Sequence, residues 1–193
     1  MTNPSVNADI AFHSNPDHNH NTAETAAQLT SQLVVSVSEQ TMRHYHNGEL
    51  LKTYTVSTAE NGIGSMEGSG KTPLGRHIIG SKIGGDQPIN AVFIARVPTG
   101  EVYSEELGAA YPERDWILSR ILRLEGCEEG LNKGVDANGV CCDTYERYVY
   151  IHGTPDSEPM GIPLSFGCIR MRNQDIIELF EQVMEGTVVD IVV

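Results

Sequence analysis

The residues of this chain best suited to covalent chemistry lie toward its C-terminal end. His152, Gly153 and Thr154 form a His-Gly-Thr motif, and Cys168 follows the histidine after sixteen residues, directly behind Gly167. A cysteine attacks a carbonyl as its thiolate, and a neighbouring histidine is the usual base that takes the thiol proton. A loop containing glycine and proline separates the two motifs, so the fold decides whether they meet in space.

The neighbours of both motifs fit an acyl-transfer site. His152 ends a predicted strand, which holds a general base on a rigid element, and Gly153 leaves the local backbone open for a carbonyl that orients the imidazole. Gly167 allows a substrate to approach the backbone, where adjacent N–H groups would face a developing oxyanion. Arg170 lies on the same side of an extended segment as Cys168, where it would neutralise the thiolate or bind a carboxylate. We expect such a thiol to ionise below the ordinary cysteine pKa of about 8.5.

The other three cysteines, Cys127, Cys141 and Cys142, are interpreted as structural. A free cysteine in a soluble protein usually packs as a small buried apolar side chain. The vicinal pair would make an awkward disulfide framework, so we expect reduced thiols. The sequence contains no CxxC pair from which a zinc site with His152 would start, and we expect neither a metal site nor a cofactor.

Composition and charge restrict the partners and the location. The 193 residues, 39% of them hydrophobic and 20% charged, suffice for one domain with a core, or for one domain and a tail. A formal net charge of −13 argues against nucleic acid and against an anionic membrane surface as partners. No segment has the length of a membrane span, and the first thirty residues lack the basic and apolar regions of a secretory signal. We therefore expect a cytoplasmic protein.

The order of predicted elements is that of a mostly β domain. Residues 1–31 are interpreted as a flexible polar leader, with a short helix at 23–30 and solvated histidines at positions 13, 18 and 20. Alternating apolar residues predict a strand at 32–38, and Asn47-Gly48 predicts a tight hairpin. Further strands are expected at 76–80, 90–96, 147–152 and 187–193. Because these strands come in hairpins and rarely alternate with helices, we expect a mainly antiparallel sheet.

Two helices and one long loop complete the prediction. Apolar residues at helical spacing, with Pro112 in the first turn and Gly126 at the end, predict a helix at 112–126. Asn173 would cap a second helix at 174–184. The glycine-rich stretch 58–75 is predicted to be a functional or mobile loop.

Several of these stretches together resemble the catalytic domain of the L,D-transpeptidase, or YkuD-like, family. His-Gly-Thr, a loop of about a dozen residues and then Ser-Phe-Gly-Cys-Ile-Arg-Met resemble the signature of that family. LVVSVSEQTMRHYHNGELLKTYTVSTA resembles its opening hairpin, GKTPLGRHII its next loop and strand, and NQDIIELFEQVMEGTVVDIV its closing helix and strand. The resemblance covers about residues 32–193.

The resemblance implies a mainly β, mixed α+β fold of β-sandwich type, with two main helices and an inserted helical segment. It also implies a cysteine acyl-transferase whose partner is a peptidoglycan-derived stem peptide. Cys168 would be the nucleophile, His152 its base and the Gly153 carbonyl the group that orients the imidazole. The backbone N–H groups of Gly167 and Cys168 would form the oxyanion hole.

Three side chains within the matching motifs, Thr154, Ser165 and Arg170, are expected to bind substrate. Many family members carry a histidine before the Gly-Cys pair, where this chain has Phe166; the change affects the wall of the site and leaves the base in place. Residues 81–146 exceed the minimal domain and are expected to form an inserted lid or a substrate-binding wall.

The favoured reaction is that of an L,D-carboxypeptidase, which trims the terminal D-alanine from muropeptide tetrapeptides during peptidoglycan recycling. An L,D-transpeptidase that forms 3-3 crosslinks or exchanges D-amino acids is the alternative. A weaker alternative is a non-catalytic muropeptide-binding module in which Phe166 spoils the site.

Overall fold

The computed structural model describes residues 30–193 of the chain. The predicted polar leader at 1–31, with its short helix at 23–30 and its histidines, lies outside the described residues except for its last two positions. Ser31 already belongs to the first strand, one residue before the predicted start at Gln32.

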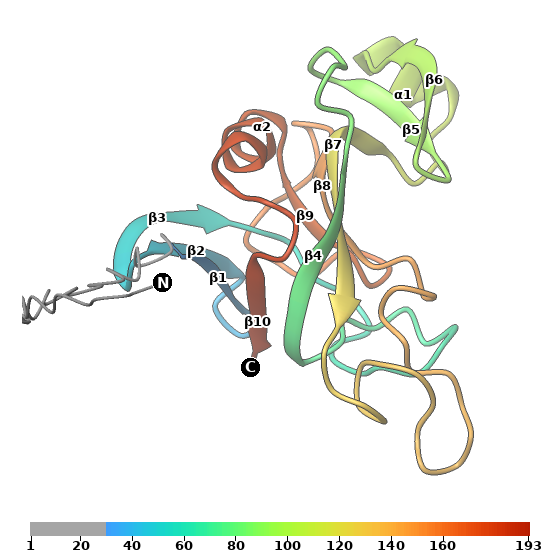
Figure 1. Ribbon diagram of the computed structural model, residues 1–193. Coiled ribbons are helices and arrows are strands. Elements are labelled where there is room, and N and C mark those ends of the chain that lie inside the picture. The colour runs from blue at the N-terminus through green and yellow to red at the C-terminus, as the bar shows by residue number, and fades with distance from the viewer. Residues whose placement is uncertain (1–29) are drawn as a thin grey trace, which may run out of the picture.

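Strands dominate the described part of the chain, as predicted, and two helices accompany them (Figure 1). The elements in chain order are β1 (Ser31–Ser36), β2 (Thr41–His46), β3 (Glu49–Thr55), β4 (Gly75–Ile83), β5 (Ala91–Ile94), β6 (Val97–Val102), α1 (Glu105–Ala110), β7 (Ile117–Gly126), β8 (Tyr150–Thr154), β9 (Ile169–Arg172), α2 (Asn173–Gln182) and β10 (Val188–Val192).

The strands form one curled sheet in the order β3-β2-β1-β10-β4-β7-β5-β6, and β7 also pairs with β8, which pairs with β9. The predicted antiparallel pairing holds for most neighbours, but β1–β10 and β8–β9 are parallel. Parallel pairing requires a long connection, and the fourteen-residue crossover between β8 and β9 supplies one. The sheet is therefore mixed, and this crossover ends at the Gly167-Cys168 pair.

The hairpin between β2 and β3 confirms the Asn47-Gly48 prediction. Both residues have positive φ, 51° and 81°, as a type I′ turn requires. The strands that flank the turn pair antiparallel, with one register shift beside Tyr45.

The predicted helix at 112–126 is wrong: most of this segment is strand β7. Eight of its ten strand residues pair with β4, β5 or β8, and the side chains from Leu118 to Leu124 are buried on both faces of the sheet. A strand covered on both faces loses the alternation that distinguishes it from a buried helix. A register shift between Leu118 and Ile121, with Ser119 at a φ of 65°, disturbs the pattern further.

The predicted C-terminal helix is confirmed as α2, but its cap differs. Arg172 occupies the N-cap position and Asn173 is the first helical residue. The buried face of α2 includes Ile176 and Leu179, which pack into the main hydrophobic core.

The region expected to be an insert at 81–146 contains the helix α1, the hairpin β5–β6 and strand β7, and it extends into a long loop. The hairpin β5–β6 and the six-residue α1 stand together at one end of β7 (Figure 1). Trp116 packs there with Val92 and Leu118 in a small separate core. A long loop, 127–149, leaves the other end of β7 and returns to β8.

Candidate active site

The parallel pair β8–β9 brings the two sequence motifs together. His152 is opposite Arg170, and Ile151 is opposite Ile169. Because side chains alternate along a strand, His152 and Arg170 share one face of the pair, while Ile151 and Ile169 pack into the main core on the other. Cys168 precedes Ile169 by one residue and therefore lies on the His152 face, diagonal to the histidine across the two strands.

His152 is held in one tautomer. Its side chain is buried, and Nδ1 lies 2.8 Å from the carbonyl oxygen of Gly153. Since a carbonyl only accepts hydrogen bonds, Nδ1 carries the proton and Nε2 is left as an acceptor. Burial lowers the pKa of His152; nearby Asp115 opposes this shift and Arg170 adds to it. The resting imidazole is therefore neutral and able to receive a proton on Nε2.

Packing requires a glycine at position 153. A Cβ there would collide with Oδ1 of Asn173 and would lie 2.7 Å from the carbonyl oxygen of Leu118. The Asn173 amide donates to the carbonyl of Thr154 at 2.7 Å, and its Oδ1 accepts from the Ser119 hydroxyl at 2.6 Å. The residue predicted to be a helix cap instead braces the end of β8, where the histidine lies.

The Cys168 thiol is uncharged at rest, contrary to the expected low-pKa thiolate. Burial raises the pKa of Cys168 to about 12; the N–H of Tyr150, 3.4 Å from Sγ, opposes this shift, as do Arg170 and Arg147 to a smaller extent. Sγ also lies 3.7 Å from the carbonyl oxygen of Tyr148. The positive neighbours are present, but the desolvation of the sulfur outweighs them.

The turn that carries Cys168 is fixed by the hydroxyl groups of two buried residues. Gly167 has a φ of +128°, and a Cβ there would approach the Lys71 carbonyl to 3.3 Å. Ser165 Oγ accepts from the N–H of Gly167 at 3.3 Å and donates to the carbonyl of Cys168 at 2.5 Å. Thr72 Oγ1 donates to the Gly167 carbonyl at 3.1 Å. Ser165, expected to bind substrate, therefore lies beneath the turn with its hydroxyl already engaged.

Two cavities meet at Phe166, whose side chain is 70% exposed. The larger, of about 430 Å³, contains Cys168 and Gly167. The smaller, of about 200 Å³, contains Arg170 and Thr154. Phe166 thus forms the wall between them, as expected for the position that varies from the family signature.

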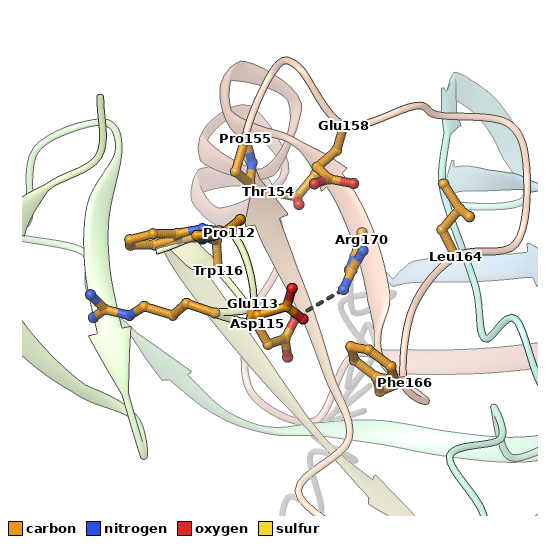
Figure 2. Close-up of a pocket in the computed structure, with 11 residues that line it drawn as sticks. Pro112, Glu113, Asp115, Trp116, Thr154, Pro155, Glu158, Leu164, Phe166 and Arg170 are labelled. Carbon is orange, nitrogen blue, oxygen red and sulfur yellow. Dashed lines mark hydrogen bonds and ion pairs between the residues drawn. The ribbon is translucent and has the colours of Figure 1, made fainter. Parts of the chain in front are cut away.

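The smaller cavity is strongly charged (Figure 2). The guanidinium of Arg170 pairs with Asp115 at 2.8 Å and lies 5.9 Å from the ring centre of Phe166. Glu113 and Glu158 also line this cavity and have no ion-pair partner within residues 30–193. Asp115 was not singled out from the sequence, because the stretch around it was interpreted as a helix. Residues 112–116 form one side of the cavity.

The larger cavity is bounded by the end of the 127–149 loop, with Glu146, Arg147 and Tyr148 along its lining. The Arg147 guanidinium donates to the Lys71 carbonyl at 2.8 Å, which ties this loop to the glycine-rich loop behind Gly167. The two loops therefore jointly support the turn at Gly167 and Cys168.

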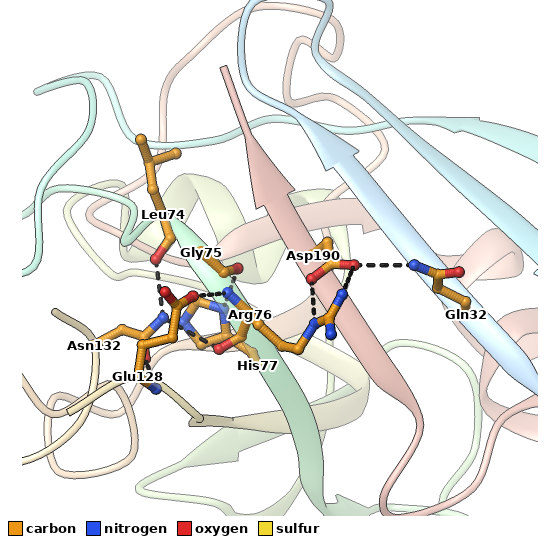
Figure 3. Close-up of polar contacts among 8 residues, drawn as sticks. All are labelled: Gln32, Leu74, Gly75, Arg76, His77, Glu128, Asn132 and Asp190. Carbon is orange, nitrogen blue, oxygen red and sulfur yellow. Dashed lines mark hydrogen bonds and ion pairs between the residues drawn. The ribbon is translucent and has the colours of Figure 1, made fainter.

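The far end of the 127–149 loop is anchored on β4 (Figure 3). The amide of Asn132 donates to the carbonyls of Leu74 and Arg76 at 3.0 and 3.1 Å. His77 is buried between the Gly75 carbonyl, 3.0 Å from Nδ1, and the Thr144 hydroxyl, 3.0 Å from Nε2. These contacts hold the loop that borders Cys168.

The other three cysteines are unpaired and differ in exposure. Cys142 is buried as expected, Cys141 is half-buried, and Cys127 is exposed, so the expectation of a buried Cys127 is wrong. Residues 30–193 contain no group of three metal-ligating side chains close enough to share an ion. Neither helix in this range has the length and apolar character needed to cross a membrane.

The fold and the motifs agree with one family model. The model of the L,D-transpeptidase catalytic domain (YkuD) matches residues 30–191. The chain belongs to the L,D-transpeptidase family. Members of this family are cysteine enzymes.

Similar proteins of known sequence or structure include members of the same family. A stretch of 63 residues is 36% identical to the probable L,D-transpeptidase YcfS of Escherichia coli K12. This stretch covers 33% of this chain and 20% of YcfS. An L,D-transpeptidase from Mycobacterium smegmatis has a similar fold, with a TM-score of 0.53, 16% identity and coverage of 86% of this chain and 59% of that one. L,D-transpeptidase 3 from Mycobacterium tuberculosis, solved with a faropenem-derived adduct, gives a TM-score of 0.51, 16% identity and coverage of 86% and 61%. The L,D-transpeptidase domain described here thus spans about three fifths of the length of these solved relatives.

Proposed function

We propose that this L,D-transpeptidase family member is a cysteine-dependent L,D-carboxypeptidase. It would remove the terminal D-alanine from the tetrapeptide stem of muropeptides through an acyl-enzyme, with Cys168 as nucleophile and His152 as base. The observation that carries the proposal is the small cavity at Arg170, which suits a single residue with a free carboxylate.

The first half of the reaction uses groups that the strand register places on one face of β8 and β9. Cys168 Sγ attacks the carbonyl on the L-centre of the third stem residue, and Nε2 of His152 takes the thiol proton. The C–N bond to D-alanine then breaks, and the histidine returns the proton to the departing amine. The thioester that remains on Cys168 is released by water, which His152 deprotonates in its turn.

Both partners are neutral before substrate binds, because burial raises the pKa of Cys168 and lowers that of His152. Proton transfer is therefore coupled to the attack on the carbonyl instead of preceding it. A positioned base of this kind contributes a rate factor of about 10² to 10⁴.

Arg170 supports the choice of a C-terminal residue as leaving group. Its fork of N–H donors suits a carboxylate, and only one of its nitrogens is bonded to Asp115. The cavity of about 200 Å³ is below the range of roughly 300 to 1,000 Å³ that larger ligands occupy. It has room for a D-alanine residue with its carboxylate at Arg170.

The same wall favours water as the acceptor. An acyl-enzyme passes its acyl group to an amine when the amine is held at attacking distance, with an effective molarity of about 10⁵ M or more. After D-alanine leaves, the vacated space of about 200 Å³, with residues 112–116 along one side, is small for a second stem peptide. Hydrolysis to the tripeptide is the outcome that this geometry supports.

L,D-transpeptidation remains the second candidate because of the larger cavity. Cys168 borders a space of about 430 Å³ that Glu67 and Glu146 also line. Carboxylates at that rim would attract the ammonium group of an acceptor stem.

The proposed setting is the cytoplasm, where muropeptides that return from wall turnover are trimmed for reuse. Four free thiols, with Cys127 exposed, fit a reducing compartment. Cell fractionation with an antibody to the full-length protein tests this assignment.

The reaction itself is tested by incubating the full-length protein with a purified disaccharide tetrapeptide and measuring the products by mass spectrometry. We expect tripeptide and D-alanine, no turnover by Cys168→Ala, and normal turnover by Cys127→Ser as the matched control. Crosslinked dimers or D-amino-acid exchange products in the majority would replace the carboxypeptidase with the transpeptidase. Binding without any product would favour the non-catalytic module.

A further inference from the structure

The backbone around the nucleophile has one polar group left unused. Gly167 and Cys168 together offer two N–H groups and two carbonyls. The Gly167 N–H donates to Ser165 Oγ, the Gly167 carbonyl accepts from Thr72 Oγ1, and the Cys168 carbonyl accepts from Ser165 Oγ. The fourth group, the N–H of Cys168, has no hydrogen-bond partner anywhere in residues 30–193.

The Thr72 hydroxyl is fixed in direction. Its side chain is fully buried, and Oγ1 accepts from the N–H of Ala59 at 3.0 Å while it donates to the carbonyl of Gly167 at 3.1 Å. A hydroxyl has only one proton, and this one is committed to the Gly167 carbonyl. The oxygen that binds the Ala59 N–H therefore also fixes the plane of the peptide between Gly167 and Cys168.

The orientation of that peptide sets the direction of the free N–H. In a trans peptide the N–H of the second residue points opposite to the carbonyl of the first. Because the buried Thr72 side chain holds the Gly167 carbonyl, the Cys168 N–H points away from Thr72. Gly167 and Cys168 both line the larger cavity and Thr72 does not, so a substrate carbonyl that meets the thiol approaches on the side of the free N–H.

We infer that Thr72 is a positioning residue that aims the Cys168 N–H at the oxyanion of the acyl-transfer intermediate. The inference rests on the proposed acyl transfer at Cys168. It also changes the predicted oxyanion hole, because Ser165 already occupies the Gly167 N–H. Gly167 and Cys168 then supply one oxyanion donor, the Cys168 N–H, and its direction depends on the Thr72 hydroxyl, which is 95 residues away from Gly167 in the sequence.

The experiment compares two reactions of the same sulfur. Acylation by p-nitrophenyl acetate passes through a tetrahedral oxyanion, whereas alkylation by iodoacetamide does not. A group that orients an oxyanion donor affects the first and leaves the second unchanged. A group that merely holds the fold affects both equally.

The variants are made in the full-length protein. Thr72→Val keeps the shape and removes the hydroxyl, and Thr72→Ser restores the hydroxyl. Thr58→Val is the matched control, because Thr58 lies in the same loop and is equally buried. Its hydroxyl oxygen accepts from Nε2 of Gln40 at 2.7 Å and does not contact the turn at Gly167 and Cys168.

We expect Thr72→Val to lower kcat on the tetrapeptide, and the rate of ester acylation, by about 10- to 100-fold. KM and the iodoacetamide rate at Cys168 should stay within about twofold of wild type. Thr72→Ser and Thr58→Val should behave like wild type in all these assays. If Thr72→Val does not fold, Thr72→Cys, which keeps a weak donor, should show the same selective loss to a smaller degree.

Equal losses in acylation and alkylation would overturn the inference and leave Thr72 with a structural role. Unchanged acylation in Thr72→Val or in a folded Thr72→Cys would overturn it as well. Should the wild-type protein accept the ester but leave the tetrapeptide intact, the proposed carboxypeptidase fails, and the ratio of acylation to alkylation still decides the role of Thr72.

Discussion

The resting state of the Cys168 thiol is open to direct measurement. An ordinary cysteine with a pKa of about 8.5 is roughly one tenth thiolate at pH 7.5, whereas a thiol with a pKa of about 12 is ionised to only a few parts in 10⁵. Alkylation requires the thiolate. We therefore expect iodoacetamide to modify Cys168 about 10³-fold more slowly at pH 7.5 than it modifies free cysteine.

The assay is a pH series of short exposures to iodoacetamide, followed by digestion and quantification of the peptide that contains Cys168. The rate at Cys168 should rise about tenfold with each pH unit from 7 to 10. Free cysteine in the same tube provides the reference, and His152→Ala should leave the alkylation rate nearly unchanged, because the histidine is neutral at rest. A rate at Cys168 that exceeds free cysteine and levels off below pH 8.5 would refute the neutral pair and restore the thiolate expected from the sequence.

Three further predictions concern the base, the charged cavity and the loop anchor. His152→Ala should lower kcat by about 10² to 10⁴, and a loss of less than tenfold would argue against its role as base. Arg170→Lys should reduce kcat/KM for the tetrapeptide far more than for its C-terminal amide; equal losses would mean that Arg170 mainly holds Asp115. Burial lowers the pKa of His77 from its ordinary 6.5 to about 4. The contribution of neutral His77 to the free energy of unfolding is therefore complete above pH 6.5, and up to about 3 kcal/mol of it is lost as the pH falls to 4. In urea unfolding, His77→Gln should be less stable than wild type at pH 7.5, and its free energy of unfolding should fall less between pH 6.5 and pH 4. If the two proteins lose stability in parallel, His77 is not the group that titrates.

The parts of the fold that could be predicted from the sequence are those set by local chemistry. Asn47-Gly48 adopts positive φ at both residues, and α2 presents one apolar side to the core. Segment 112–126 could not be assigned in this way, because strand β7 is covered on both faces and Arg120 and Arg123 interrupt its apolar run while being buried themselves. The burial that makes β7 the centre of the sheet also removes the alternation that identifies a strand.

Some residues of the candidate site could be found from sequence motifs, whereas others became visible only through contacts in the structure. The motifs identified Cys168, His152 and Arg170, which strand register then placed on one face. They did not reveal Thr72, which reaches Gly167 across 95 residues of sequence, or Asp115, which reaches Arg170 across 55. A motif marks the residues that the chemistry needs, whereas long-range contacts become visible only once the sheet has closed.

A neutral nucleophile beside a neutral base has a consequence for selectivity. Two neutral groups, His152 buried and Cys168 half-buried, avoid the desolvation cost of a resting ion pair, so the site is compatible with a well-packed sheet. Charge appears only when the substrate carbonyl accepts the sulfur, and at that moment the oxyanion needs a donor already in place. If the Cys168 N–H is that donor, a substrate carbonyl that does not reach it is attacked slowly, even when the carbonyl lies close to the thiol. The same reasoning applies to the second step, since water attacks the thioester carbonyl from a position that leaves its oxygen on the same N–H. Selection of the scissile bond would then depend on the placement of one peptide group, which Thr72 and Ser165 hold from behind.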